Sequence, residues 1–274
     1  MEQSTNSTSI PTNGNRLPVL FKSPRPKRLT DDWTDMIPQY KQTVLELILD
    51  ILGDPLVVDY ALRTIAQCLS PRKLNNEFYV WYGGMGKGVL RDLVKNIFGD
   101  HFSPMNEDYL IRRWKDNMTY NADPFMYSKA IARIVIGVEP DHKRKLSTDR
   151  ILAMTSNTPI TCGKWKSKPH TFTPNMNVVL QTNADLNIDM KCKELVDQIR
   201  VIRFPWYYVD NPTQPNEKRL NIGLKTTIQS DEYKIGFYHL LLEYYGKVMQ
   251  DGGVIGMPDV VRDATNAMLA RIHN

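Results

Sequence analysis

A cluster of glycines and one lysine stands at residues 83–88, in the order Gly-Gly-Met-Gly-Lys-Gly. Glycines let a backbone turn its N–H groups inward as a cradle for phosphate oxygens, and the start of a helix adds partial positive charge. A lysine in such a loop reaches the β- and γ-phosphates of a nucleotide. The predicted nucleotide-binding residues are Gly83, Gly84, Met85, Gly86, Lys87, Gly88 and Val89.

The loop departs from the complete phosphate-loop pattern G-x-x-x-x-G-K-[ST] at two positions. The pattern requires glycine at position 81 and serine or threonine at position 88, where this chain has Trp81 and Gly88. The hydroxyl missing at position 88 is the group that normally holds Mg²⁺. We therefore expect nucleotide binding with weakened hydrolysis.

Two polar residues downstream each end an apolar strand. Glu139 follows the run at 134–138, and Asn183 ends the run NVVLQTN. Ligands of open α/β sheets bind at the carboxyl ends of the strands, where both residues would meet the glycine loop. Glu139 could hold Mg²⁺ through water or polarise an attacking water, and Asn183 could orient that water against the γ-phosphate. The order of loop, acid and amide predicts one catalytic site.

Hydrophobic periodicity supplies the elements that would position these residues. The aromatic and β-branched run at 78–81 predicts a buried strand that leads into the glycine loop, and a helical pattern follows the loop. Further strands are expected at 134–138, at 177–183 and in the run IRVIRFPW. Strands that alternate with helical stretches predict an α/β fold with a mostly parallel sheet.

Helices are expected before and after this sheet. The first has an apolar face and is ended by Gly53 and Pro55. Its apolar face comprises Val44, Ile48, Ile51 and Leu52. A second helix covers LVVDYALRTIAQCLS, and two more close the chain at 231–250 and about 258–272.

Composition, helical periodicity and the glycine loop divide the chain into four expected regions. A disordered arm, rich in Ser, Thr, Asn and Pro, covers residues 1–30. Residues 31–75 form a helical lead-in, which could act as a collar for oligomerisation. A P-loop ATPase core at 76–210 and a C-terminal helical region at 211–274 complete the chain.

The net charge, the cysteine spacing and the length of the apolar runs limit the classes of protein to which the chain could belong. The 274 residues carry a formal charge of +5, which is compatible with a nucleic-acid partner but does not require one. Cys68, Cys162 and Cys192 are widely spaced, without a CxxC pair, which fits a reducing compartment. No apolar run approaches the ~20 residues of a membrane span, and the first residues lack the apolar core of a secretory signal. We expect a soluble, intracellular protein.

From about Tyr40 onward the sequence resembles the superfamily 3 helicase domain of large-DNA-virus and phage primase-helicases, which is an AAA+-like P-loop ATPase. The segment from Asp54 to Phe102 resembles that family's helical lead-in, strand and loop. The family's strand that ends in the sensor asparagine resembles the stretch TFTPNMNVVLQTN. The strand that follows its arginine finger resembles the stretch IRVIRF. LLLEYYGKVMQDGGVIGMPDVVRDAT resembles its helical tail.

The resemblance implies an ATP-dependent DNA helicase or translocase of viral or phage-like DNA replication, using ATP and Mg²⁺. It also implies a homo-hexameric ring on single-stranded or forked DNA, in a host cell if the protein is viral. No primase-like motif precedes Asp31 in this sequence, and the resemblance leaves open a primase on a separate chain as a further partner. The position of the arginine finger is occupied by Gln198, and Arg200 is the nearest substitute because an offset of two in a strand keeps the same face.

Alternating lysines mark the stretch CGKWKSKPHTFTP between residues 162 and 174. In an extended hairpin these lysines share one face and could contact phosphates, while the aromatic groups could stack on bases. The resemblance places this stretch where the family inserts its pore hairpin. The predicted DNA-binding residues are Lys164, Trp165, Lys166, Lys168 and His170, although a solvated hairpin tip has the same composition.

Two other functions remain open on the sequence. A degenerate relative could bind nucleotide or DNA, or join a ring, without efficient turnover. A small P-loop phosphotransferase would share the loop, but the lysine hairpin and the long helical tail count against it. Gly88 and Gln198 are the residues that separate an active helicase from a degenerate ring subunit.

Overall fold

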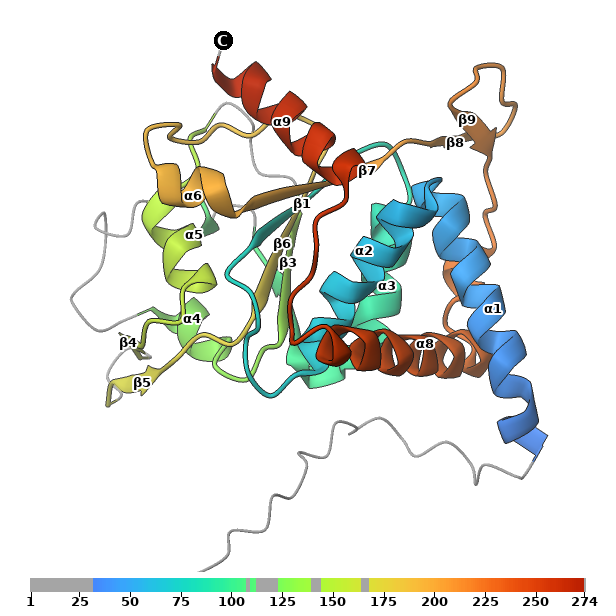
Figure 1. The fold of residues 1–274 in the computed structure, drawn as a ribbon, viewed down its shortest axis with the longest axis horizontal. Coiled ribbons are helices and arrows are strands. Elements are labelled where there is room, and N and C mark those ends of the chain that lie inside the picture. Colours follow the sequence, from blue (N-terminus) through green and yellow to red (C-terminus); the bar gives the residue numbers. More distant parts are fainter. Residues whose placement is uncertain (1–31, 107–108, 112–122, 139–143, 164–167, 274) are drawn as a thin grey trace, which may run out of the picture.

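The computed structural model describes five parts of the chain: residues 32–106, 109–111, 123–138, 144–163 and 168–273. The arm expected at residues 1–30 lies outside them. Their centre is a five-stranded sheet in the order β2-β3-β6-β1-β7, with every neighbouring pair parallel (Figure 1). The strands are β1 (Phe78–Gly83), β2 (Phe102–Met105), β3 (Ile134–Val138), β6 (Asn177–Thr182) and β7 (Ile199–Phe204). The predicted parallel α/β sheet is confirmed.

Helices cover both faces of the sheet. The described helices of four turns or fewer are α2 (Pro55–Ala66), α3 (Lys87–Phe98), α4 (Pro124–Ser128), α5 (Thr148–Thr155), α6 (Lys193–Gln198) and α7 (Leu224–Thr227). The longer ones are α1 (Asp32–Leu52), α8 (Asp231–Gln250) and α9 (Asp259–His273). In Figure 1, α1, α2, α3 and α8 lie on one side of the sheet, and α4, α5 and α6 lie on the other.

Side chains of each central strand alternate between two hydrophobic clusters. Tyr79 and Trp81 of β1 pack with the cluster under α1, α2, α3 and α8, whereas Phe78 and Val80 pack with the cluster under α4, α5 and α6. A strand buried on both faces appears as a largely apolar run, which is why β1, β3 and β6 could be recognised in the sequence.

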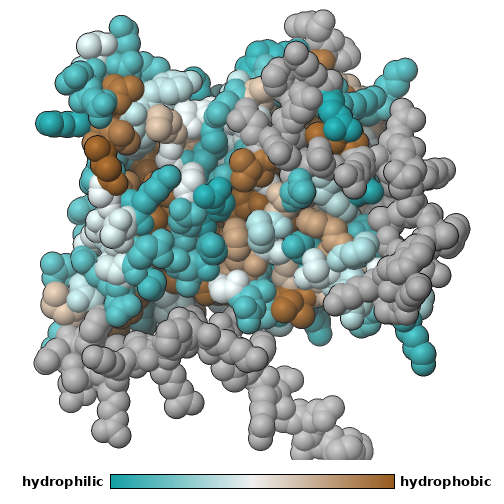
Figure 2. Space-filling model, turned by 180° about the vertical axis from the view of Figure 1, so that it is seen from behind, coloured by the Kyte–Doolittle hydropathy of each residue, from teal (hydrophilic) through white to brown (hydrophobic). Residues whose placement is uncertain are grey.

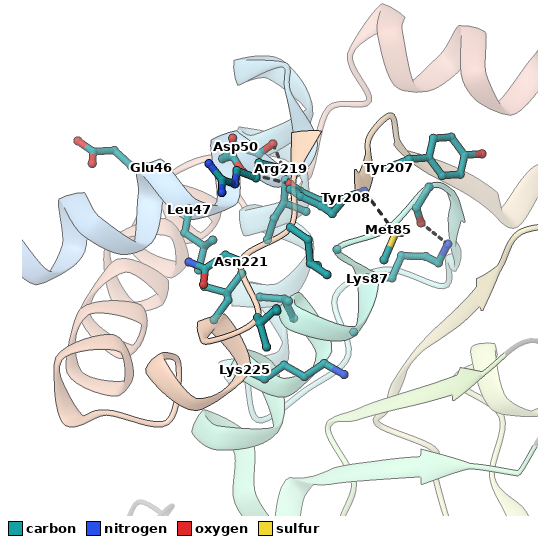
Figure 3. A pocket seen from close by; sticks show the side chains of 18 of the residues that line it. Glu46, Leu47, Asp50, Met85, Lys87, Tyr207, Tyr208, Arg219, Asn221 and Lys225 are labelled. Atoms are coloured by element: carbon teal, nitrogen blue, oxygen red, sulfur yellow. Dashed lines mark hydrogen bonds between the residues drawn. The ribbon is translucent and has the colours of Figure 1, made fainter. Parts of the chain in front are cut away.

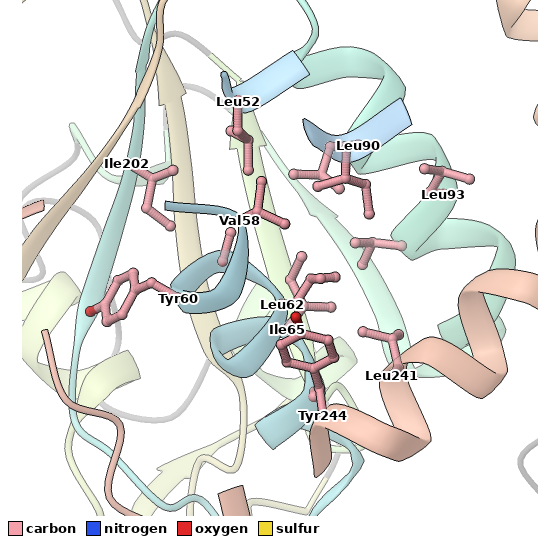
Figure 4. Packing of buried hydrophobic residues seen from close by; sticks show 14 of the residues in the cluster. Leu52, Val58, Tyr60, Leu62, Ile65, Leu90, Leu93, Ile202, Leu241 and Tyr244 are labelled. Carbon is pink, nitrogen blue, oxygen red and sulfur yellow. The ribbon is translucent and has the colours of Figure 1, made fainter. Parts of the chain in front are cut away.

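The first helix uses its predicted apolar face within the chain. Val44 and Ile48 of α1 are completely buried, and α1 packs along α8. Figure 4 shows part of the same cluster, where Leu52 lies with residues of α2, α3 and α8. The N-terminal helices therefore share one core with the glycine-loop helix α3 and the C-terminal helix α8.

Two small strand pairs stand outside the main sheet. Strands β4 (Ile160–Cys162) and β5 (His170–Phe172) are antiparallel, so the predicted hairpin around the lysines is present at its base. Strands β8 (Tyr207–Val209) and β9 (Glu217–Arg219) follow β7 and pair in parallel.

The surface mixes hydrophilic and hydrophobic residues. On the face seen in Figure 2, the hydrophobic residues lie in separate groups among hydrophilic ones. Within the described parts of the chain, no helix combines the length and apolar character needed to cross a membrane.

Candidate nucleotide site

The glycine loop connects the end of β1 to the start of α3, as predicted. Gly83 and Gly86 have positive φ angles of 94° and 99°, in the left-handed region that favours glycine. Gly86 is the N-cap of α3, and Lys87 is the first residue of that helix. The first N–H groups of α3 therefore point toward the loop, where a phosphate would find both donors and partial positive charge.

Two walls press closely on the loop. A Cβ atom added at Gly84 would lie 2.2 Å from the carbonyl oxygen of Trp206, and one added at Gly86 would lie 2.7 Å from Cγ2 of Ile51. Gly88 differs, because a Cβ atom there would meet nothing within 4 Å. Glycine is thus required by the contacts at Gly84 and Gly86, but a side chain fits at position 88.

Backbone hydrogen bonds fix the loop against the segment that follows β7. The N–H of Gly84 donates to the carbonyl oxygen of Phe204, and the N–H of Met85 donates to that of Trp206, each at 2.7 Å. On the other side, the amide of Gln181 in β6 donates to the carbonyl oxygen of Lys87 at 2.9 Å. The loop is held from both neighbouring strands of β1.

Lys87 and Asn183 lie together at the carboxyl edge of the sheet. The Lys87 amino group donates to the Gly83 carbonyl, to the Gly84 carbonyl at 2.7 Å and to Oδ1 of Asn183. The contact follows from the register, since Tyr82 of β1 pairs with Thr182 of β6. The ammonium group is therefore next to the loop, with acceptors that a phosphate oxygen could replace.

The turn that carries Asn183 is anchored at both ends. The hydroxyl of Thr182 accepts from the N–H of Ala184 at 3.0 Å. Beyond it, Asp185 accepts from Arg271 of α9, with Nη2 to Oδ1 at 2.8 Å. This hydrogen bond to Arg271 is the main reason that the pKa of Asp185 lies below its usual value. The C-terminal helix thus holds the turn in place.

An open pocket of about 1070 Å³ extends from the glycine loop. Its other walls come from α1, from β8 and β9, and from residues 220–225, as Figure 3 shows. Lys87, Arg219 and Lys225 bring positive charge to the lining, and Leu47, Leu220 and Ile222 bring apolar surface. A phosphate chain on the loop would leave its organic part in this half-apolar space.

Metal ligands are sparse among the described residues. Gly88 has no side-chain oxygen, and the predicted acid Glu139 lies outside the described part of the chain. Within that part, no group of three or more His, Cys, Asp and Glu side chains could hold a metal ion. A role for Glu139 toward Mg²⁺ stays a prediction.

Arg200 and Gln198 lie away from the glycine loop of their own chain. Arg200 pairs in register with Tyr79, near the start of β1, and its Nε donates to Glu77 at 2.9 Å. Gln198 is the last residue of α6, and β7 begins only at Ile199, so the expectation that Gln198 and Arg200 share one face of a strand is wrong. The amide oxygen of Gln198 accepts from the hydroxyl of Thr155 at 2.7 Å. A role for Arg200 at the site of a neighbouring subunit stays a prediction.

The lysine hairpin is described only in part. Lys164, Trp165 and Lys166 lie outside the described residues. Lys168 and His170 are exposed, and the His170 ring stacks on Phe172 with 5.9 Å between centroids. The DNA-binding assignment of this hairpin stays a prediction.

Sequence reasoning missed the walls of the pocket. Thr43 and Leu47 appear in the sequence as parts of an ordinary amphipathic helix, and Arg219 and Lys225 as surface cations. The aromatic run WYYV after β7 is a signal that this segment packs against the rest of the protein. In the structure, the backbone of Trp206 and of Tyr208 contacts the glycine loop.

Comparisons with known proteins identify distant viral relatives and similar solved structures. No family model matches the sequence. "Putative helicase L207/L206" of Acanthamoeba polyphaga mimivirus is 26% identical over 213 residues, which are 74% of this chain and 22% of that protein. "Putative helicase V13" of Sputnik virophage is 23% identical over 172 residues, which are 61% of this chain and 22% of that protein. The chain thus spans about a fifth of the length of these curated relatives.

A solved structure has the same fold. The apo form of the NrS-1 C-terminal region (305–718) aligns with a TM-score of 0.57 at 16% identity, over 83% of this chain and 51% of that one. At this identity the match speaks for the fold alone. The parallel sheet and the viral relatives are consistent with the resemblance of the sequence to superfamily 3 helicase domains.

Proposed function

We propose that the protein is an ATP-dependent DNA helicase or translocase of superfamily 3 type, acting in viral or phage-like DNA replication. The observation that carries the proposal is the meeting of Lys87 and Asn183 beside a glycine loop at the N-terminus of α3. The helicase names of the viral relatives support the same class of activity.

Each group has a distinct task in this proposal. Lys87 leaves its carbonyl acceptors for the β- and γ-phosphates of ATP, and Asn183 orients the attacking water. Glu139, at the end of the next strand, polarises that water or holds Mg²⁺ through water. When bound with ATP, Mg²⁺ neutralises charge on the phosphate oxygens.

The partners follow from the same resemblance. Subunits assemble as a homo-hexamer around single-stranded or forked DNA. Residues 31–75 contribute to the collar of this ring. Arg200 completes the site of a neighbouring subunit, for which it must leave Glu77.

Replacing Lys164, Lys166 and Lys168 together by alanine should weaken single-stranded DNA binding regardless of sequence. Each phosphate contact releases a counterion, so the log–log salt slope should flatten by roughly 0.7 per lost contact on single strands. Fluorescence anisotropy of labelled oligonucleotides at several salt concentrations measures both quantities.

ATP binding is the control for this triple variant, because Lys87 belongs to a different surface and should bind ATP as before. Trp165→Ala should cost about 1–3 kcal/mol of DNA binding with little change in slope, if the indole stacks on a base. A triple variant with the affinity and salt slope of the original protein would make the hairpin a solvated tip.

A second candidate is a degenerate ring subunit that binds nucleotide or DNA without efficient turnover. The specific observation in its favour is Gly88, which cannot supply the hydroxyl that normally holds Mg²⁺. The two candidates share the fold and the loop, and they separate on whether single-stranded DNA stimulates ATP hydrolysis.

A further inference from the structure

The glycine loop lies between two parts of the chain that are far apart in sequence. On one side is the segment after β7, whose Phe204 and Trp206 carbonyls accept from the loop. On the other side is the C-terminal end of α1, where Ile51 packs so closely on Gly86 that no Cβ would fit. The distance between these two walls therefore sets the shape of the loop.

Three side chains tie the two walls together: Asp50, Tyr208 and Lys218, which we call the Asp50 clamp. Nζ of Lys218 donates to the backbone carbonyl and to Oδ1 of Asp50, each at 2.6 Å. The hydroxyl of Tyr208 donates to Oδ2 of Asp50 at 3.1 Å. Burial and the Asp50 charge raise the pKa of Tyr208, so the phenol keeps its proton and remains a donor.

The position of Lys218 suits this task for a second reason. Asp50 lies in the last turn of α1, where unpaired backbone carbonyls leave partial negative charge. The Lys218 ammonium caps this end and at the same time lies over the Trp206 ring, 4.2 Å from its centroid. One cation therefore joins α1 to Trp206, the residue whose carbonyl accepts from Met85.

The contact between the strand and the loop is also direct. The N–H of Tyr208 donates to the sulfur of Met85 at 3.3 Å, as the dashed line in Figure 3 marks. Movement of Tyr208 away from Asp50 would therefore move Met85 and the loop with it. Asp50, Tyr208 and Met85 all line the nucleotide pocket.

We propose that Asp50, Tyr208 and Lys218 are positioning residues, which hold the glycine loop in the shape that binds the triphosphate of ATP. The inference rests on the proposed function, since it concerns the same nucleotide. With the clamp opened, the wall at Trp206 and the wall at Ile51 separate, and the loop N–H groups no longer converge on the phosphates.

The chain contains a matched ion pair for comparison. Lys41 of α1 donates to Glu243 of α8 at 2.6 Å, the same distance as in the pair of Lys218 with Asp50. The lysine side chains of the two pairs are similarly exposed, at 31% for Lys41 and 27% for Lys218. Lys41 joins α1 to α8 and is not part of the nucleotide pocket.

Lys218→Ala should weaken ATP binding by about three- to tenfold, since exposed ion pairs contribute up to about 1 kcal/mol and a charge-assisted hydrogen bond adds to this. Titration calorimetry with ATP measures the dissociation constant, and thermal unfolding of the same samples measures stability. Lys41→Ala should lower the Tm to a similar degree and leave the ATP affinity unchanged. Lys218→Arg should restore most of the affinity, because arginine pairs with carboxylates and stacks on aromatic rings.

Equal ATP affinities for Lys218→Ala, Lys41→Ala and the original protein would overturn the clamp. A similar loss of affinity in both alanine variants would also overturn it, since the effect would then follow general stability. Lys87→Ala separates this failure from failure of the proposed function. If Lys87→Ala abolishes ATP binding and Lys218→Ala does not change it, the nucleotide site is supported. The proposed positioning role of the Asp50 clamp is then wrong.

Discussion

Lys87→Ala should abolish ATP hydrolysis and weaken ATP binding by roughly thirtyfold or more. Truncating one partner of a buried, hydrogen-bonded charge pair costs about 2–5 kcal/mol, and 1.4 kcal/mol is tenfold. The N–H groups at the start of α3 cannot replace a full positive charge on the β- and γ-phosphates. Titration calorimetry and a phosphate-release assay measure the two losses.

Lys95→Ala is the matched control for this variant. Lys95 is exposed in the last turn of the same helix, so its replacement removes the same charge without touching the loop. It should bind ATP like the original protein. If Lys87→Ala and the original protein bind ATP with equal affinity, the glycine loop is not the nucleotide site.

Gly84→Ala should both destabilise the protein and impair ATP binding. The new Cβ would lie 2.2 Å from the Trp206 carbonyl oxygen and 2.9 Å from that of Phe204, and neither backbone atom can turn away as a side chain would. Overpacking of this kind costs about 1–3 kcal/mol of unfolding free energy. The shift would also break the hydrogen bond from the Gly84 N–H to Phe204.

Gly88→Ser tests the specificity of that effect within the same loop. Position 88 has a negative φ angle and open space around it, so serine should not lower the unfolding free energy. Serine would also bring back the hydroxyl that commonly holds Mg²⁺, and slow hydrolysis should become faster. Urea unfolding measures the unfolding free energy of the two variants. Equal stability of Gly84→Ala and the original protein would show that the carbonyl oxygens of Trp206 and Phe204 do not exclude a Cβ at position 84.

The central part of the fold could be predicted because it is buried on both faces. Strands β1, β3 and β6 appear as largely apolar runs, and β7 as an apolar segment that contains two arginines. The ends of all four strands lie within about two residues of those predicted. Strand β2 could not be predicted, because it is only four residues long and contains Pro104, a residue that argues against a strand.

Part of the candidate site could also be predicted from the sequence, and part could not. Lys87 and Asn183 could be paired in advance, since residues at the carboxyl ends of neighbouring parallel strands meet at one edge. The pocket walls could not, because Leu47 and Ile222 come together only through the packing of α1 and the path of the chain after β9. Nor does the sequence reveal that Arg200 is bonded to Glu77, 123 positions away.

The most direct test of the proposed function is the rate of ATP hydrolysis with and without single-stranded DNA. We expect a slow rate for the protein alone, a faster rate when single-stranded DNA is added, and no hydrolysis by Lys87→Ala under either condition. A protein that binds ATP but hydrolyses none, with or without DNA, would contradict the helicase proposal and favour the degenerate ring subunit.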